Sequence, residues 1–218
     1  MNRILAIVLF IPLAASVSPV AAQEAAPEFT TEGLELVEKD RRGAVYADPK
    51  IDWSLYTEIS LDRPTVAFRR NWQRDQNRYT FKVREDDVER IKTELADLFE
   101  EVFTEELTTK GGYAMSDGTG GNVMRLTPHI VDLDVYAPDT NTAFRTYSVT
   151  QTPGQMTLKL SLYDATTGDL IAAVSDKQEP PRTWMRWTTR VTNQAEFRRM
   201  LQHWAISLRE QLDEARSG

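Results

Sequence analysis

The chain has 218 residues, a net charge of −7 and no cysteine. The lack of cysteine excludes disulfide bonds, thiolate metal sites, thiol catalysis and a lipid attached through cysteine at a cleavage site. The acidic balance argues against nucleic-acid binding, which needs a basic surface, so we expect no nucleic-acid partner.

The first 22 residues have the pattern of a cleavable secretory signal. Arg3 is followed by an apolar run from Ile4 to Ala15, and the small residues Val20-Ala21-Ala22 form a cleavage site. This run is shorter than the roughly 20 residues of a spanning helix, although an uncleaved anchor remains the alternative reading. We expect cleavage after Ala22 or nearby, with no transmembrane segment in the mature chain, and therefore a periplasmic location. Because Arg3 is the leader's one charged residue, the mature chain has a net charge of −8.

Residues 23–33 read as a flexible linker, and residues 34–216 as a single domain. Tyr56 to Phe68 alternates apolar and polar residues around Pro64, which predicts two short strands or one bent strand. Glu85 to about Thr109 has the three-to-four spacing of an amphipathic helix, with acids in its first turn. The apolar face of this helix holds Val88, Ile91, Leu95, Leu98, Phe99, Val102 and Leu107.

Further strands and a second long helix follow. Val123 to Tyr136 changes phase along its length, which predicts a bulge or bend near Pro128. Gln155 to Tyr163 alternates cleanly and is joined by a turn to a return strand from Leu170 to Val174. Asn193 to about Ala215 is apolar on one face, at Phe197, Met200, Leu201, Trp204, Ala205, Leu208 and Leu212.

The order of these elements predicts an α+β fold. Each long helix is apolar on one face only, so both must bury that face against a common partner. The simplest arrangement is a mostly antiparallel sheet with the two long amphipathic helices packed on one of its faces.

Three polar residues on one predicted strand suggest an enzyme as the alternative function. Asp132 and Asp134 share a face in a regular strand, and paired carboxylates can perform acid–base chemistry. His129 lies an odd number of residues from Asp132, so an unbroken strand sends them to opposite faces, and a bulge is needed to join them. The alternative is an envelope hydrolase that uses Asp132 and Asp134 with His129. We expect no metal or cofactor, and assign no catalytic residue.

Two segments combine arginine with tryptophan inside an acidic chain. Both residue types are enriched at binding hot spots, and arginine also pairs with phosphates and carboxylates. The simpler interpretation is that the arginines pair with the chain's own carboxylates and the tryptophans cover the core. The binding interpretation is a contact surface for an envelope protein, an anionic lipid headgroup or a wall polymer. This predicted aromatic-basic surface comprises Arg70, Trp72, Arg74, Arg182, Trp184, Arg186, Trp187 and Arg190.

Several short motifs, in their order along the chain, resemble a bacterial envelope family catalogued as domain of unknown function 3313. The motifs are Asp52-Trp53-Ser54 with Tyr56, the strand residues Leu61, Val66 and Phe68, the first long helix, Tyr163-Asp164-Ala165 with Thr167-Gly168-Asp169, and Trp204-Ala205 with Leu208-Arg209. The resemblance covers about residues 34 to 215. It implies an exported, often lipid-anchored protein without an assigned activity, and it supplies no catalytic residues. Because this chain lacks the lipid-bearing cysteine, we expect a free periplasmic form.

No constellation in the sequence demands a particular reaction. We therefore predict an exported periplasmic protein that acts as a non-enzymatic binding or scaffolding module of the cell envelope.

Overall fold

The computed structural model describes residues 33–78, 83–135, 148–150, 154–179, 186–188 and 190–217. The helices are α1 (Trp72–Gln76), α2 (Glu85–Glu105) and α3 (Arg190–Ser217), with a short 3-10 helix η1 (Trp53–Leu55) and a π-helical turn η2 (Glu106–Lys110). The strands are β1 (Glu35–Lys39), β2 (Gly43–Ala47), β3 (Glu58–Leu61), β4 (Thr65–Phe68), β5 (Ala114–Met115), β6 (Val123–Asp134), β7 (Ser148–Thr150), β8 (Gln155–Asp164), β9 (Leu170–Gln178) and β10 (Arg186–Thr188).

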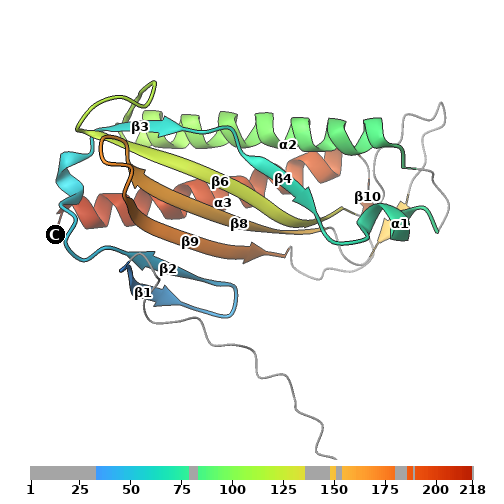
Figure 1. The fold of residues 1–218 in the computed structure, drawn as a ribbon. Coiled ribbons are helices and arrows are strands. Elements are labelled where there is room, and N and C mark those ends of the chain that lie inside the picture. The colour runs from blue at the N-terminus through green and yellow to red at the C-terminus, as the bar shows by residue number, and fades with distance from the viewer. Residues whose placement is uncertain are drawn as a thin grey trace, which may run out of the picture.

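Within the described residues, eight strands form one mixed sheet (Figure 1). Its order is β1-β2-β9-β8-β6-β3-β5, with β4 also paired to β6 beyond the end of β3. Along this order, each neighbouring pair from β1 through β2, β9 and β8 to β6 is antiparallel. Strands β3 and β4 run parallel to β6. Strands β7 and β10 form a separate two-stranded sheet. The predicted α+β class with a mostly antiparallel sheet is therefore confirmed.

The alternation in β8 gives the sheet one apolar and one polar face. Met156, Leu158, Leu160 and Leu162 are buried, whereas Lys159 on the opposite face is exposed. The buried residues share one hydrophobic cluster with Phe99 and Phe103 of α2 and Leu201 and Trp204 of α3. The two helices also contact each other. The predicted apolar faces of both helices thus supply the core.

Of two predictions for the middle strands, one is confirmed and one is wrong. Tyr56 to Phe68 contains two short strands, β3 and β4, separated around Pro64. The phase change in β6 lies at Asp132, whose φ of 53° marks an irregularity between Val131 and Asp134, and not near Pro128 as predicted. Pro128 lies where the neighbouring strand changes from β3 to β4, which is a position that tolerates a missing N–H donor.

The hairpin of β1 and β2 was not expected from the sequence. The side chain of Asp40 closes its turn by accepting hydrogen bonds from the backbone N–H groups of Arg42 (2.7 Å) and Gly43 (2.8 Å). Residue 43 must be glycine, because a Cβ there would lie 1.6 Å from the carbonyl oxygen of Ser175 in β9. The close approach of these backbones fastens the hairpin to the edge of the sheet.

Candidate functional site

A groove lies between the hairpin, the neighbouring strand β9 and the C-terminal half of α3, and we call it the hairpin groove. It has two compartments, with volumes of about 130 Å³ and 370 Å³. The two compartments are adjacent, because both are lined by Glu38, Val45, Val174, Leu208 and Gln211. A volume of a few hundred cubic ångströms is in the range of ligand-binding clefts.

The smaller compartment ends in a polar network centred on Asp176 of β9. Its oxygen Oδ2 accepts hydrogen bonds from Nε1 of Trp204 and from Nε2 of Gln178, each at 2.7 Å. Nε of Arg42 lies 3.9 Å from the other oxygen of Asp176 and 3.2 Å from Oδ2 of Asp40. Hydrogen bonds from the backbone of Arg42 and Gly43 hold the pKa of Asp40 below its ordinary value. The acids of this compartment are thus already paired.

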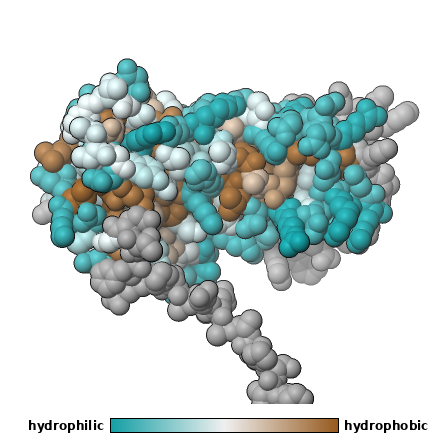
Figure 2. Space-filling view, viewed as in Figure 1, coloured by the Kyte–Doolittle hydropathy of each residue, from teal (hydrophilic) through white to brown (hydrophobic). Residues whose placement is uncertain are grey.

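The larger compartment is lined mainly by apolar residues, and one of its wall residues is exposed to solvent. Val37 of β1 is 65% exposed although it lines this compartment. Further apolar surface comes from Val45, Trp53, Leu162 and Leu212. Figure 2 shows apolar residues at the end of the molecule where η1 lies and also over its middle. The exposed Val37 therefore adds to the apolar surface that solvent reaches in this compartment.

The rim of the larger compartment is acidic. Among the described residues that line it, Glu38 of β1 and Glu214 of α3 carry charge, and both are carboxylates on opposite walls. Nε2 of Gln211 on α3 donates a hydrogen bond of 3.4 Å to Oε2 of Glu38, so this contact crosses the groove. The larger compartment therefore combines an apolar floor with negative charge at its edges.

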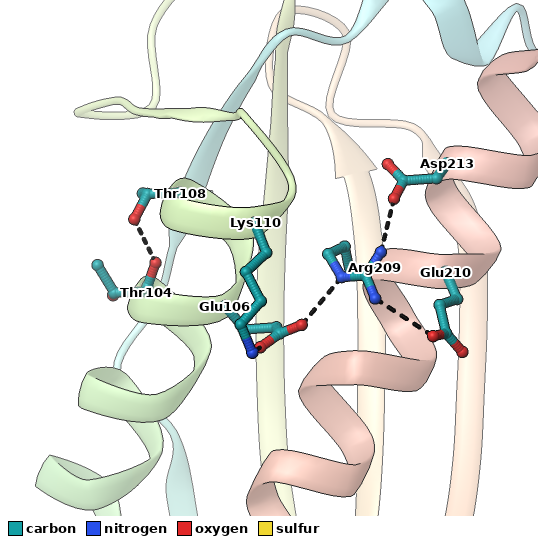
Figure 3. Close-up of polar contacts among 7 residues, drawn as sticks. All are labelled: Thr104, Glu106, Thr108, Lys110, Arg209, Glu210 and Asp213. Carbon is teal, nitrogen blue, oxygen red and sulfur yellow. Dashed lines mark hydrogen bonds and ion pairs between the residues drawn. The ribbon is translucent and has the colours of Figure 1, made fainter.

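An ion cluster around the buried Glu106 joins η2, which continues α2, to the same half of α3 (Figure 3). Glu106, at the start of the π-helical turn, is 6% exposed and accepts hydrogen bonds from Arg209 (2.9 Å) and Lys110 (2.7 Å). Arg209 also binds Asp213 at 2.9 Å and Glu210 at 3.2 Å. Burial alone would raise the pKa of Glu106, but the two cations outweigh it and lower that pKa. The cluster fixes the helix that forms one wall of the hairpin groove.

The three residues of the hydrolase alternative have separate structural roles. Nδ1 of His129 lies 2.7 Å from Oγ1 of Thr65 on β4, and Oδ2 of Asp134 accepts a hydrogen bond of 2.8 Å from Nε of Arg69. Asp132 is exposed at the irregularity of β6. Within the described part of the chain, no group of three or more acidic or histidine residues is placed to hold a metal. The structure thus brings His129, Asp132 and Asp134 into no common cluster.

The structure corrects one member of the aromatic-basic surface. Trp72 is 1% exposed, stacks on Phe68 with ring centroids 4.0 Å apart, and donates from Nε1 to the carbonyl oxygen of Val135 at 2.9 Å. It is therefore a core residue and is unavailable for a surface contact, because its large apolar ring is more stable inside. Arg70 and Arg74 are exposed, and Nε of Arg74 lies 3.7 Å from Oδ1 of Asp75.

The second aromatic-basic segment is described only in part. Arg182 and Trp184 lie outside the described residues. Arg186 and Trp187 belong to β10, which pairs with β7, and Arg190 begins α3. Figure 1 draws β10 and α1 at the same end of the molecule, away from the hairpin. A shared binding role for these residues stays a prediction.

Sequence reasoning missed the residues of the hairpin groove. The available signal was Asp40-Arg41-Arg42-Gly43, a turn-forming acid and a glycine between two short segments that contain valine. Because four of the five residues of β1 are exposed, no buried face reveals the strand as an alternating pattern.

Motif residues of the family resemblance serve the fold. The side chain of Asp52 caps η1 through the N–H of Ser54 at 3.1 Å, and the hydroxyl of Tyr56 donates to Oδ2 of Asp164 at 2.9 Å. Asp164 in turn accepts from the N–H groups of Thr166 and Thr167, each at 2.8 Å, and so orders the turn between β8 and β9. Burial and the bond to Asp164 raise the pKa of Tyr56 above its ordinary range.

Among the described residues, none of the helices has the combination of length and hydrophobicity that crossing a bilayer requires. No curated protein matches the chain in sequence. Several solved structures are distantly similar to it, and two of them serve as examples. A PelC dodecamer from Paraburkholderia phytofirmans has a TM-score of 0.35 and 10% identity, over 73% of this chain and 96% of that chain. A PDZ domain protein from Parabacteroides distasonis has a TM-score of 0.37 and 8% identity, over 72% of this chain and 33% of that chain.

These scores are too low to carry an argument about function. The sequence profile of one family, described as a protein of unknown function (DUF3313), matches residues 30–208. That match spans β1 to β10 and most of α3, and it includes the hairpin and the lining of the groove as far as Leu208. The chain therefore belongs to the DUF3313 family.

Proposed function

We propose that this chain is an exported periplasmic protein that acts as a non-enzymatic binding module of the cell envelope, with the hairpin groove as its binding site. One observation carries the proposal. The groove is an apolar cleft of about 370 Å³ whose wall holds Val37 at 65% exposure, in a domain that otherwise buries its core fully around Phe99 and Leu201.

The proposal takes both long helices to cover the apolar face of the sheet. Contacts between α2 and α3 and their shared hydrophobic cluster with β8 support this arrangement. The strands β1 and β2 then extend the sheet beyond α3, and the groove is the space between that extension and the helix. A site built between a sheet and a rigid helix is preorganised, which reduces the entropic cost of binding.

Support for binding over catalysis comes from the pairing of two carboxylates in the groove. Asp176 accepts two hydrogen bonds, and Asp40 accepts bonds from two backbone N–H groups in its turn. A general acid or base needs a proton-transfer group that faces a substrate, and a carboxylate that already accepts two hydrogen bonds is poorly suited to that role.

The export part of the proposal rests on the leader at residues 1–22. Cell fractionation of the full chain with N-terminal sequencing tests it. We expect a periplasmic protein that begins near Gln23. Untrimmed protein in the cytoplasm contradicts export.

The aromatic-basic surface, now without Trp72, stays a second proposed contact region. Its exposed arginines Arg70 and Arg74 suit an envelope protein with an acidic surface, an anionic lipid headgroup or a wall polymer. Because Figure 1 draws this region at the end away from the hairpin, the two sites can be tested independently.

Photo-cross-linking in the source cells tests the hairpin groove. Benzoylphenylalanine placed at Val37, on the groove wall, is compared with the same group at Met115, which is 40% exposed on β5 at the other edge of the sheet. We expect an adduct with a second protein at position 37 and none at position 115. Equal adducts at both positions, or none at either, contradict the groove as the binding site.

A further inference from the structure

We infer that the occupant of the hairpin groove is an amphipathic segment of another protein, with apolar side chains on one side and lysine or arginine on the other. The inference rests on the groove being a binding site, as proposed above, and adds the chemistry of the partner. It draws on the lining of the groove, the sign of its rim charges and its length along α3.

The lining selects an occupant with apolar side chains. Val45 of β2, Val174 of β9 and Leu208 of α3 line both compartments, and Leu212 extends this surface along the helix. Moving apolar surface from water into such a groove releases about 25 cal/mol per Å². A purely polar ligand would offer no apolar surface to this lining, so this free energy would not be released.

The charged residues on the rim favour an occupant that carries positive charge. Glu38 and Glu214 lie on opposite walls of the larger compartment, and they are the charged groups among its described lining residues. The whole chain has a net charge of −7, so the long-range field has the same sign as the rim. A fatty acid or an anionic lipid would bring a second negative charge toward these carboxylates, whereas lysine or arginine would pair with them.

The length of the groove favours a polypeptide segment over a small molecule. Its lining residues on α3 run from His203 to Ala215, which corresponds to about 18 Å along a helix at 1.5 Å per residue. That length matches about three turns of a bound helix or about five residues of a strand. Laying an amphipathic segment into an apolar groove is a recurring mode of peptide recognition.

Three labelled peptides of equal length test the inference by fluorescence anisotropy. They share the same leucine positions and carry lysine, glutamine or glutamate at all polar positions. Each peptide is titrated with the wild-type protein, with the rim variant Glu38→Gln/Glu214→Gln, and with Ala215→Trp, which fills the groove from an exposed position. The control Asp86→Asn/Glu105→Gln removes two exposed acids of α2 outside the groove.

We expect the lysine peptide to bind the wild-type protein most tightly and to lose affinity in the groove-filled variant. Two weak ion pairs predict that the rim variant binds this peptide about threefold to tenfold less tightly, while the control changes by less than about twofold. Raising the salt concentration from about 0.05 M to about 0.5 M should remove most of this difference.

The contrary outcomes separate this inference from the proposed function. If all three peptides bind alike and still depend on an open groove, the basic partner is wrong and the groove remains a binding site. If neutral phosphatidylcholine vesicles bind the wild-type protein but not Ala215→Trp, the occupant is a lipid and the inference is wrong. If no peptide or vesicle responds to Ala215→Trp, the groove itself fails as a binding site.

Discussion

The indole nitrogen Nε1 of Trp204 donates a hydrogen bond of 2.7 Å to Oδ2 of Asp176, and so ties α3 to β9 at the polar end of the hairpin groove. This bond fixes the distance between the two walls of the groove. Because the acceptor is a carboxylate that is 20% exposed, the bond is charge-assisted and partly shielded from water.

Trp204→Phe removes this donor while it keeps most of the buried ring. We expect the free energy of unfolding, measured by urea denaturation, to fall by about 1.5–3 kcal/mol. Trp53→Phe is the matched control, since Trp53 lines the groove and is only partly buried. Equal losses in the two variants would show that the bond to Asp176 contributes nothing beyond packing.

Glu106→Gln tests the ion cluster between the helices. We expect a loss of about 1–3 kcal/mol in the free energy of unfolding near neutral pH, because Arg209 and Lys110 lose their shared buried carboxylate. The folded-state pKa of Glu106 lies below its ordinary value of 4.5. Its stabilising effect is therefore present above that ordinary value and is lost as the pH falls through the folded-state pKa.

Urea denaturation across the acidic range checks this dependence. The difference between the wild type and Glu106→Gln should shrink as the pH falls from about 7 to about 3. A difference that stays constant over this range would mean that the charge of Glu106 has no stabilising role.

Asp132 tests the backbone of β6. Its φ of 53° lies in the left-handed region, which glycine adopts freely and β-branched residues avoid. We expect Asp132→Gly to change the free energy of unfolding by less than about 0.5 kcal/mol, and Asp132→Val to lower it by about 1–2 kcal/mol. A larger loss for glycine than for valine would indicate that the carboxylate, and not the backbone, matters at this position.

Variants at Trp72 and Arg70 compare a core residue with a surface residue of the first aromatic-basic segment. Trp72→Ala should cost about 3–5 kcal/mol in thermal or urea unfolding, since it empties a buried site and leaves the carbonyl of Val135 without its donor. Arg70→Ala should stay within about 0.5 kcal/mol, because Arg70 is exposed. Similar small effects for both would contradict the burial of Trp72.

The long periodic elements could be predicted from the sequence. The apolar face of α3 contains Leu201, Trp204 and Leu208, which are all buried as expected. The alternation of β8 also assigned its buried face correctly. These predictions succeed because a helix or strand with one buried face repeats its apolar residues with a local period.

Features that depend on distant parts of the chain could not be predicted. The parallel pairing of β3 and β4 with β6 joins segments about 65 residues apart, and their sequences carry no record of that register. The sequence predicts an irregularity near Pro128 because proline usually interrupts strands. In the structure the irregularity of β6 lies at Asp132, which has a left-handed backbone conformation.

The hairpin groove needs three separate segments in one place, so no single pattern indicates it. Val37 is exposed on a short edge strand, and Leu212 has the spacing of an ordinary core residue. Only the attachment of β2 to β9 through Gly43 brings these residues to opposite walls. The family resemblance rests on short motifs in a fixed order along the chain, and two of their residues, Tyr56 and Asp164, form a hydrogen bond across 108 positions.

Amide chemical-shift mapping of the isotope-labelled protein with the lysine-bearing amphipathic peptide is the most direct measurement of the groove's role. The account predicts concentration-dependent shifts in β1, β2, β9 and the part of α3 from His203 to Ala215, with little change in β3, β5 and the first turns of α2. Saturable shifts centred on α2 and β3, with the amides of Val45, Val174 and Leu212 unmoved, would contradict it.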